Sequence, residues 1–240
     1  MVWIAAGAVF LGAALQSATG FGFALVSAPI LFAVLGPEQA VTAGVLLGMS
    51  LNLLTLVTEG RRPQVLTRDA LALVAWSLPG LVLGAIALRE LSDQLLSVLV
   101  ALAVLGGLAL RLLARARPAP RPRSWHLAAA GASSGALSTS TSLSGPPLVF
   151  FLLGRAVSPE RMRDTLAAIF VAEAVLGLPV LLATATFELP GHAGVLLGAG
   201  IAGQVLGRRG FALLGGDRYE AAVLVVLALT ALVALASTVV

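Results

Sequence analysis

Apolar residues fill most of the chain in long runs, and short polar or arginine-bearing breaks separate these runs. A helix needs about 20 apolar residues to cross a hydrocarbon core of about 30 Å, and several runs approach that length. Two longer runs, residues 2–35 and 125–154, are interrupted near their middle by small polar residues, at 17–20 and 138–142. The pattern therefore predicts an all-α integral membrane protein. After each interrupted run three crossing helices are expected, over residues 40–58, 69–88 and 94–113 and then over 165–184, 193–207 and 220–238.

The two halves of the chain share a sequence pattern. Residues 27–36 (SAPILFAVLG) recur as residues 145–154 (GPPLVFFLLG), and residues 80–84 (GLVLG) recur as residues 203–207 (GQVLG). The recurring segments lie about half a chain apart, and a duplicated unit of roughly 120 residues is the simplest explanation.

The arginines distinguish two topologies. All 15 residues counted as Lys or Arg are arginines. If both interrupted runs pass straight through the membrane, the arginines divide into eight on one side and seven on the other. If each run folds back as a hairpin, fourteen share one side and Arg89 stands alone on the other. The positive-inside rule therefore favours hairpins, with the fourteen arginines in the cytoplasm and both termini outside.

One hairpin plus three crossings is an odd number of passes, so the second repeat enters from the opposite face. This predicts two inverted-topology repeats, each a broken helical hairpin plus three transmembrane helices, an architecture typical of secondary transporters. The expected division is a first repeat over residues 1–115, a cytoplasmic Arg/Pro linker over 116–124 and a second repeat over 125–240. Re-entrant and fully crossing hairpins both fit the charges. Arms of about 14 residues, near 21 Å, favour re-entrant ones.

Composition excludes several classes of protein. Hydrophobic residues make up 59% of the chain and charged residues 11%, which fits no soluble domain. The sequence pI of about 11.2 reflects arginines beside apolar runs, so we expect no nucleic-acid partner. The chain has no cysteine, and its two histidines, His126 and His192, lie far apart in the sequence. We therefore expect no metal site and no cofactor. The N-terminal Met-Val-Trp-Ile carries no basic residue ahead of the apolar run, so no signal peptide is predicted.

At each hairpin tip a new helix begins, and its unpaired N–H groups and positive dipole end attract anions. Hydroxyl groups there donate hydrogen bonds to an oxyanion, and glycines let the backbone approach it. The alternative is that these small residues only cap helices and permit close packing. This structural role would explain one such tip more readily than two tips at matching repeat positions. Two amides within the spans join the candidates, although they also fit a role as links between helices. The predicted substrate ligands are Gln16, Ser17, Thr19, Gly20, Gly22, Asn52, Ser138, Thr139, Ser140, Thr141, Ser142, Ser144, Gly145 and Gln204.

Glu173 is the one carboxylate well inside an apolar span. An intramembrane acid is a functional candidate, so Glu173 is a candidate for proton coupling, with a hydrogen bond between helices as the alternative.

Residues 131–135 (GASSG) match the G-x-S-x-G pattern of serine hydrolases. No strand precedes them and His126 lies only seven residues before Ser133, so no catalytic residue is predicted.

The hairpin segments, residues 20–29 and 134–147, together with the late Gly-xxx-Gly element of each half, resemble the TauE/SafE sulfite exporter family, also called the 4-toluene sulfonate uptake permease family. The resemblance covers nearly the whole chain. It implies a multi-pass permease of the bacterial inner membrane that carries sulfite, an organosulfonate or a related small anion. A carboxylate carrier, or a membrane enzyme that uses the same pocket, is the alternative. The expected partners are the anion, a coupling proton and the lipid bilayer, and the oligomeric state stays open, with a homodimer among the options.

Overall fold

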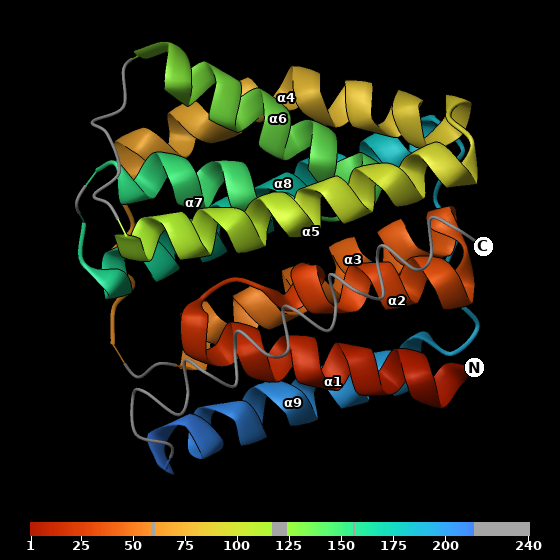
Figure 1. Ribbon diagram of the computed structural model, residues 1–240, viewed down its shortest axis with the longest axis horizontal. Helices are drawn as coiled ribbons and strands as arrows, with labels where there is room; N and C mark the ends of the chain where they lie inside the picture. The colour runs from red at the N-terminus through yellow and green to blue at the C-terminus, as the bar shows by residue number, and fades with distance from the viewer. Residues whose placement is uncertain (59–60, 117–123, 156, 214–240) are drawn as a thin grey trace.

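The computed structural model describes residues 1–58, 61–116, 124–155 and 157–213, and within them the chain is a bundle of nine α-helices without a β-strand (Figure 1). The predicted helical class is thereby confirmed. The predicted crossing helix over 220–238 and most of the predicted linker over 116–124 lie outside the described residues. The helices are α1 (Val2–Thr19), α2 (Phe23–Leu35), α3 (Pro37–Thr58), α4 (Thr67–Glu90), α5 (Asp93–Ala116), α6 (Ser124–Thr141), α7 (Gly145–Leu153), α8 (Pro159–Ala183) and α9 (Ala193–Leu213).

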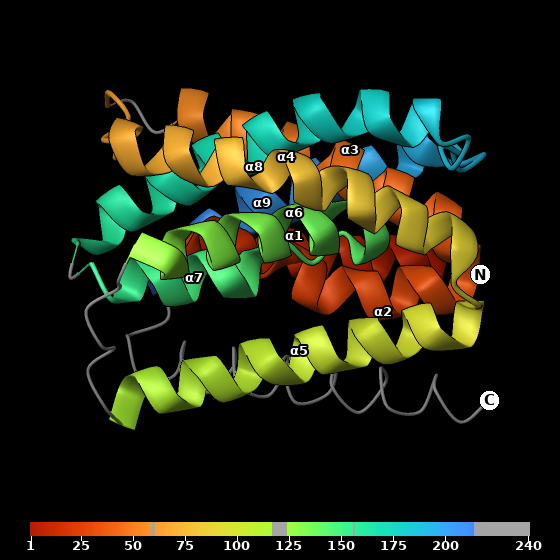
Figure 2. The ribbon, with the colours of Figure 1, turned by 90° about the horizontal axis from the view of Figure 1, so that it is seen from above.

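The bundle turns apolar side chains both inward and outward. Three stretches are long and apolar enough to cross a membrane: α3, α4 and residues Glu160–Ala183 of α8. Large apolar side chains on the outer surface include Leu83, 63% exposed, and Leu102, 60% exposed. Such a surface is unfavourable in water and favourable against lipid tails. Figure 2 shows α5 along one side of the bundle, where it contacts α2 and α7.

Both interrupted runs fold back as hairpins, and each break begins at the last residue of the interruption that the sequence indicates. Helix α1 continues through Ser17 and ends before Gly20, which has a φ of 79°. Helix α6 continues through residues 138–141 and ends before Ser142, which has a φ of 59°. The small polar residues do not break these helices, because their hydroxyls donate to backbone carbonyls one turn earlier. In this way Ser140 donates to Ala136 (2.7 Å).

The hairpin arms are also unequal. Helices α1 and α6 have 18 residues each, whereas α2 has 13 and α7 has 9. At 1.5 Å per residue, the first arms are about 27 Å long and the second arms about 20 and 14 Å. Helix α2 is close to the expected arm length of about 14 residues, whereas α1 and α6 are longer and α7 is shorter. The first arm of each hairpin is long enough to reach most of the way across a hydrocarbon core.

Glycines allow two pairs of helices to approach closely, α4 with α6 and α1 with α9, at opposite edges of the bundle (Figure 1). A Cβ atom on Gly80 or Gly84 would collide with the backbone of Ala132 or Ala136 in α6. On the other edge, Cβ atoms on the Gly203/Gly207 pair of α9 would collide with the α1 backbone. These two small-xxx-small pairs are packing contacts. By contrast, Cβ atoms on Gly48, Gly194 and Gly198 would meet no described atom within 4 Å, so packing explains only part of the glycine pattern.

The same contacts give the helix directions. Gly80 and Gly84 meet α6 residues in the same chain order, so α4 and α6 run in the same direction. Along α9, Gln204 donates to the Thr55 hydroxyl (2.8 Å) and Arg208 to that of Thr58 (2.8 Å), so α9 runs in the same direction as α3. Helix α1 is parallel to α9 by the same criterion. The start of α8 lies at the end of α3 and its end at the start of α3, so these two are antiparallel.

Ion pairs gather at the end of the bundle where α3 ends and α8 begins. Arg61 binds Asp164 through both carboxylate oxygens, at 2.7 and 3.0 Å, and Arg155 binds Asp69 at 2.5 Å. Arg89 lies at the opposite end, in the last turn of α4. The described arginines therefore separate as the hairpin topology predicts. Of the others, Arg117, Arg121, Arg123 and Arg218 lie outside the described residues, as do the side chains of Arg111, Arg115 and Arg209.

Candidate functional site

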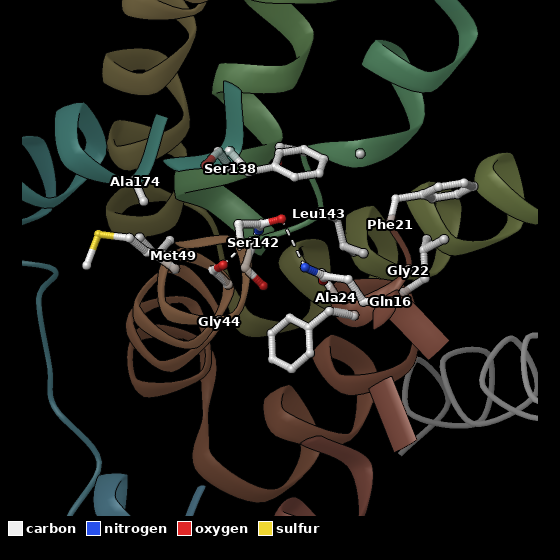
Figure 3. Close-up of a pocket in the computed structure, with 18 of the residues that line it drawn as sticks. Gln16, Phe21, Gly22, Ala24, Gly44, Met49, Ser138, Ser142, Leu143 and Ala174 are labelled. Carbon is white, nitrogen blue, oxygen red and sulfur yellow. Dashed lines mark hydrogen bonds between the residues drawn. The ribbon is translucent and has the colours of Figure 1, made fainter. Parts of the chain in front are cut away.

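A cavity of about 60 Å³ lies between the two helix breaks (Figure 3). The start of α2, the turn before α7, the middle of α3 and the middle of α8 all line it. Its volume is far below the roughly 300–1,000 Å³ of pockets for drug-sized ligands. No charged side chain is among the described residues that line it.

Two buried amides form one polar wall of the cavity. Gln16 Nε2 of α1 donates to Asn52 Oδ1 of α3 at 3.0 Å, and Asn52 Nδ2 donates to the Gly48 carbonyl at 2.7 Å (Figure 3). Gln16 and Asn52 are only 4% and 3% exposed. Each amide NH₂ has two hydrogens, and these contacts use one of each. The second hydrogens remain to be matched by a ligand or water.

Ser142, at the second helix break, has the least ordinary environment in the cavity. Its φ of 59° is left-handed, a conformation that costs a residue with a Cβ about 1–2 kcal/mol. Its hydroxyl packs against Gly44 of α3 and has no hydrogen-bond partner among the described residues, although the atom is buried. An unpaired buried hydroxyl in a strained conformation on a cavity wall points to a ligand that it binds.

The corresponding turn at the first break uses glycine. Gly20 takes the left-handed conformation, with a φ of 79°, and its N–H donates to the Gln16 carbonyl at 2.8 Å. A Cβ atom there would lie 2.5 Å from Cγ and 2.8 Å from Cβ of Arg163, so a larger residue would displace that side chain. This contact brings a cationic side chain to the first hairpin tip, whereas the sequence had left Arg163 at the end of a span.

The two helix N-termini at the breaks differ in the donors they present. The first-turn amides of α2, at Phe23, Ala24 and Leu25, have no intrahelical acceptor, and all three residues line the cavity. Helix α7 has Pro146 and Pro147 in its first turn, and proline has no N–H. The first hairpin therefore supplies backbone donors and the second mainly hydroxyls, an asymmetry that the matching sequence patterns did not reveal.

Apolar side chains complete the lining of the cavity. They include those of Phe21, Phe23, Met49, Phe170 and Ala174. These residues were not among the predicted ligands, because isolated aromatic residues in apolar spans carry no signal of their own. The available signal was helical spacing: Met49 precedes Asn52 by three positions and Phe170 precedes Glu173 by three.

The structure brings half of the predicted ligands to the cavity. Those that line it are Gln16, Gly22, Asn52, Ser138, Ser142, Ser144 and Gly145. The others lie elsewhere or lack a described side chain. Ser17 donates to the Ala14 carbonyl (2.7 Å), and Gln204 bonds to α3 at Leu51 and Thr55. The three residues between Ser138 and Ser142 also donate to backbone carbonyls, namely Thr139 to Leu81 (2.6 Å), Ser140 to Ala136 (2.7 Å) and Thr141 to Leu137 (2.9 Å). Gly20 lies in the turn, and the side chain of Thr19 is outside the described part of the chain.

Glu173 lies behind the cavity and does not line it. It is 1% exposed, and its Oε1 lies 2.7 Å from the Ser134 hydroxyl of α6. The Ser144 hydroxyl approaches the same carboxyl group, and Oε2 has no hydrogen-bond partner in the part of the chain that the structure describes. Ser133 and Ser134 of the G-x-S-x-G pattern are both within α6, and no strand leads into them. Among the described residues, no group of three or more His, Cys, Asp or Glu side chains is placed to hold a metal ion.

The chain as a whole matches one known family. Residues 4–234 match the family model described as Sulfite exporter TauE/SafE. The matched range includes both helix breaks and every described residue that lines the cavity. No curated protein and no solved structure matches the chain.

Proposed function

Because the chain belongs to the sulfite exporter TauE/SafE family, we propose that this membrane transporter carries a small sulfur oxyanion or organosulfonate through the cavity between its two helix breaks. Members of this family are transporters and not enzymes, which removes the membrane enzyme as an alternative. The observation that carries the proposal is Ser142 on the cavity wall, which has a left-handed backbone and a buried hydroxyl without a hydrogen-bond partner among the described residues.

The donors of the cavity suit an oxyanion. Gln16, Asn52, Ser138 and Ser142 present amide or hydroxyl hydrogens, and the first turn of α2 adds backbone N–H groups. Hydrogen bonds to a charged group are roughly twice as strong as neutral ones, so several neutral donors hold an anion without a salt bridge. A site without a fixed cation also releases its anion more readily, as a carrier requires.

The mixed lining of the cavity supports this substrate class. An SO₃ group bound to the amide and hydroxyl donors would leave a short organic substituent for the apolar residues that also line the cavity, such as Phe21, Met49 and Phe170. Inorganic sulfite would use the polar donors alone. A small carboxylate presents fewer oxygens to the same donors and is the alternative substrate.

The fold supports transport by alternating access between two inverted repeats, over residues 1–115 and 125–240, joined by a linker over 116–124. In this division α1 to α4 correspond to α6 to α9. In each repeat the first helix packs against the fourth helix of the other repeat: α1 packs against α9, and α6 packs against α4. Members of corresponding pairs run in opposite directions, as inverted topology requires. The cavity lies between the two units.

The orientation that we propose places the arginine-rich end of the bundle in the cytoplasm and the Arg89 end outside. The positive-inside rule supports it, because Arg61, Arg155, Arg161 and Arg208 all lie at one end. Both termini are then periplasmic, in a bacterial inner membrane.

The test is counterflow in proteoliposomes. Vesicles loaded with unlabelled sulfite are expected to accumulate radiolabelled sulfite, and external methanesulfonate is expected to compete, whereas acetate competes weakly. Asn52→Ala should weaken competition, because it removes a donor and frees the Gln16 amide from its partner. Ser140→Ala is the matched control, since that hydroxyl bonds only its own helix. No counterflow with any sulfur anion would contradict the proposed substrate class, and stronger competition by acetate would favour the carboxylate carrier.

A further inference from the structure

The Ser134 hydroxyl of α6 stands between two acceptors. Its Oγ lies 2.7 Å from Glu173 Oε1 and 3.1 Å from the backbone carbonyl oxygen of Ser144. Ser134 is fully buried, so water does not supply a further partner. A serine hydroxyl has one hydrogen and therefore donates one full hydrogen bond at a time.

Both contacts are satisfied together when the Glu173 carboxyl carries a proton. The neutral acid then donates from Oε1 to Ser134 Oγ, and Ser134 donates its own hydrogen to the Ser144 carbonyl. When Glu173 is ionised, the carboxylate accepts the Ser134 hydrogen, and the Ser144 carbonyl loses this donor. The described geometry, with an unpaired Oε2, fits the neutral acid, because a buried carboxylate needs several donors.

No described charged group offers Glu173 an alternative partner. Helices α3, α4, α6 and α7 pack against α8. Helix α7 has no ionisable residue. Those of α3, α4 and α6 stand in the terminal turns of these helices, and those of α8 stand in its first two turns, at least nine residues before Glu173. These residues are Glu38 on α3, Arg68, Asp69, Arg89 and Glu90 on α4, His126 on α6, and Glu160, Arg161, Arg163 and Asp164 on α8.

We propose that Glu173 is a proton-binding site of this transporter and that Ser134 relays its protonation state to Ser144 at the second helix break. This inference rests on the proposed transport function. Ser144 lines the cavity and directly precedes α7, so the loss of its carbonyl hydrogen bond frees the turn that carries the Ser142 hydroxyl. The turn that keeps the Ser134–Ser144 hydrogen bond then binds both the proton and the anion. The turn that has lost this hydrogen bond releases both. One proton moves with one monoanion, and the complex that crosses gains no net charge.

The experiment separates exchange from proton-driven uptake. Wild-type protein in proteoliposomes is supplied with radiolabelled methanesulfonate, which stays ionised over the tested pH range, and with radiolabelled sulfite. Counterflow at equal pH on both sides reports carrier function, and uptake driven by a pH gradient, with a pH-sensitive dye in the lumen, reports proton coupling. In Glu173→Gln we expect loss of gradient-driven accumulation and of the dye signal. Ser134→Ala is expected to lower the ratio of protons to anions moved.

Ser133→Ala is the matched control, because the neighbouring hydroxyl is exposed and donates to the Ala129 carbonyl of its own helix. It should keep the coupling of the wild type. If Glu173→Gln still accumulates substrate down a pH gradient with a full dye signal, the proton site is wrong while the carrier function stands. If the wild type shows no counterflow, the proposed function fails instead.

A spectroscopic measurement tests the proton site without any transport. Infrared difference spectra of the purified wild type between low and high pH should contain the C=O band of a protonated carboxyl that Glu173→Gln lacks. Ser134→Ala should shift that band in frequency, and Ser133→Ala should leave it in place. A band that persists in Glu173→Gln, or one that Ser134→Ala leaves unshifted, would overturn the relay.

Discussion

Replacing Ser142 by glycine should have two opposite effects on the free energy of unfolding. The left-handed conformation of Ser142 costs about 1–2 kcal/mol, and glycine removes this cost. Glycine also loses more backbone freedom on folding, by roughly 0.5–1 kcal/mol. The net gain in the free energy of unfolding is therefore between about 0 and 1.5 kcal/mol, and each kcal/mol corresponds to a rise of about 2–4 °C in Tm for a chain of this size.

The same substitution removes the hydroxyl that faces the cavity. A hydrogen bond to a charged ligand contributes about 1.5–3 kcal/mol. At 1.4 kcal/mol for each factor of ten, the Kd for the anion should rise about 10- to 150-fold. Ser142→Gly is thus expected to be slightly more stable and to bind much more weakly. Ser142→Ala should show the same loss of affinity without the gain in stability, because the alanine Cβ keeps the strain.

The assay is a thermal unfolding series in detergent with increasing sulfite or methanesulfonate. It reports the Tm without ligand and, from the shift with concentration, the Kd. Ser140→Ala should leave the Kd unchanged. If Ser142→Gly raises the Tm and keeps the wild-type Kd, then Ser142 is only a strained turn residue, and the inference from its unpaired hydroxyl is refuted.

Two further predictions concern packing and orientation. Gly84→Ala places a Cβ against the α6 backbone and should lower the free energy of unfolding by about 1–3 kcal/mol, whereas Gly198→Ala, which meets no described atom within 4 Å, should change it by less than about 0.5 kcal/mol in a thermal melt. Equal melting temperatures would mean that α4 and α6 are not in close contact. Because the chain has no cysteine, single-cysteine variants give an unambiguous topology test. Ser92→Cys in intact cells should react with a membrane-impermeant maleimide and Arg62→Cys should not, and the reverse result would invert the proposed orientation.

Local properties of the chain made much of the fold predictable. The length of an apolar run sets where a helix crosses, and arginines stay in the water at its ends, so the hairpins and the separation of Arg89 from the other described arginines followed from the sequence. The Gly80/Gly84 spacing permits a close helix contact, and the structure has that contact with α6. The exact positions of the breaks did not follow, because serine and threonine inside a helix bond to its own carbonyls and leave it intact.

The residues that line the cavity could not be predicted in the same way, because they depend on which side of each helix faces which neighbouring helix. Ser138, near the end of α6, and Ser142, in the turn after it, both line the cavity, while the three residues between them donate to backbone carbonyls. Phe170 joins the site only because α8 packs beside α3. The sequence by itself determined the helices, their breaks to within a few residues and the chemistry available at the tips. Only the tertiary structure decided which hydroxyls face the cavity and that Ser134 meets Glu173, since these depend on the rotation of each helix against partners far away in the chain.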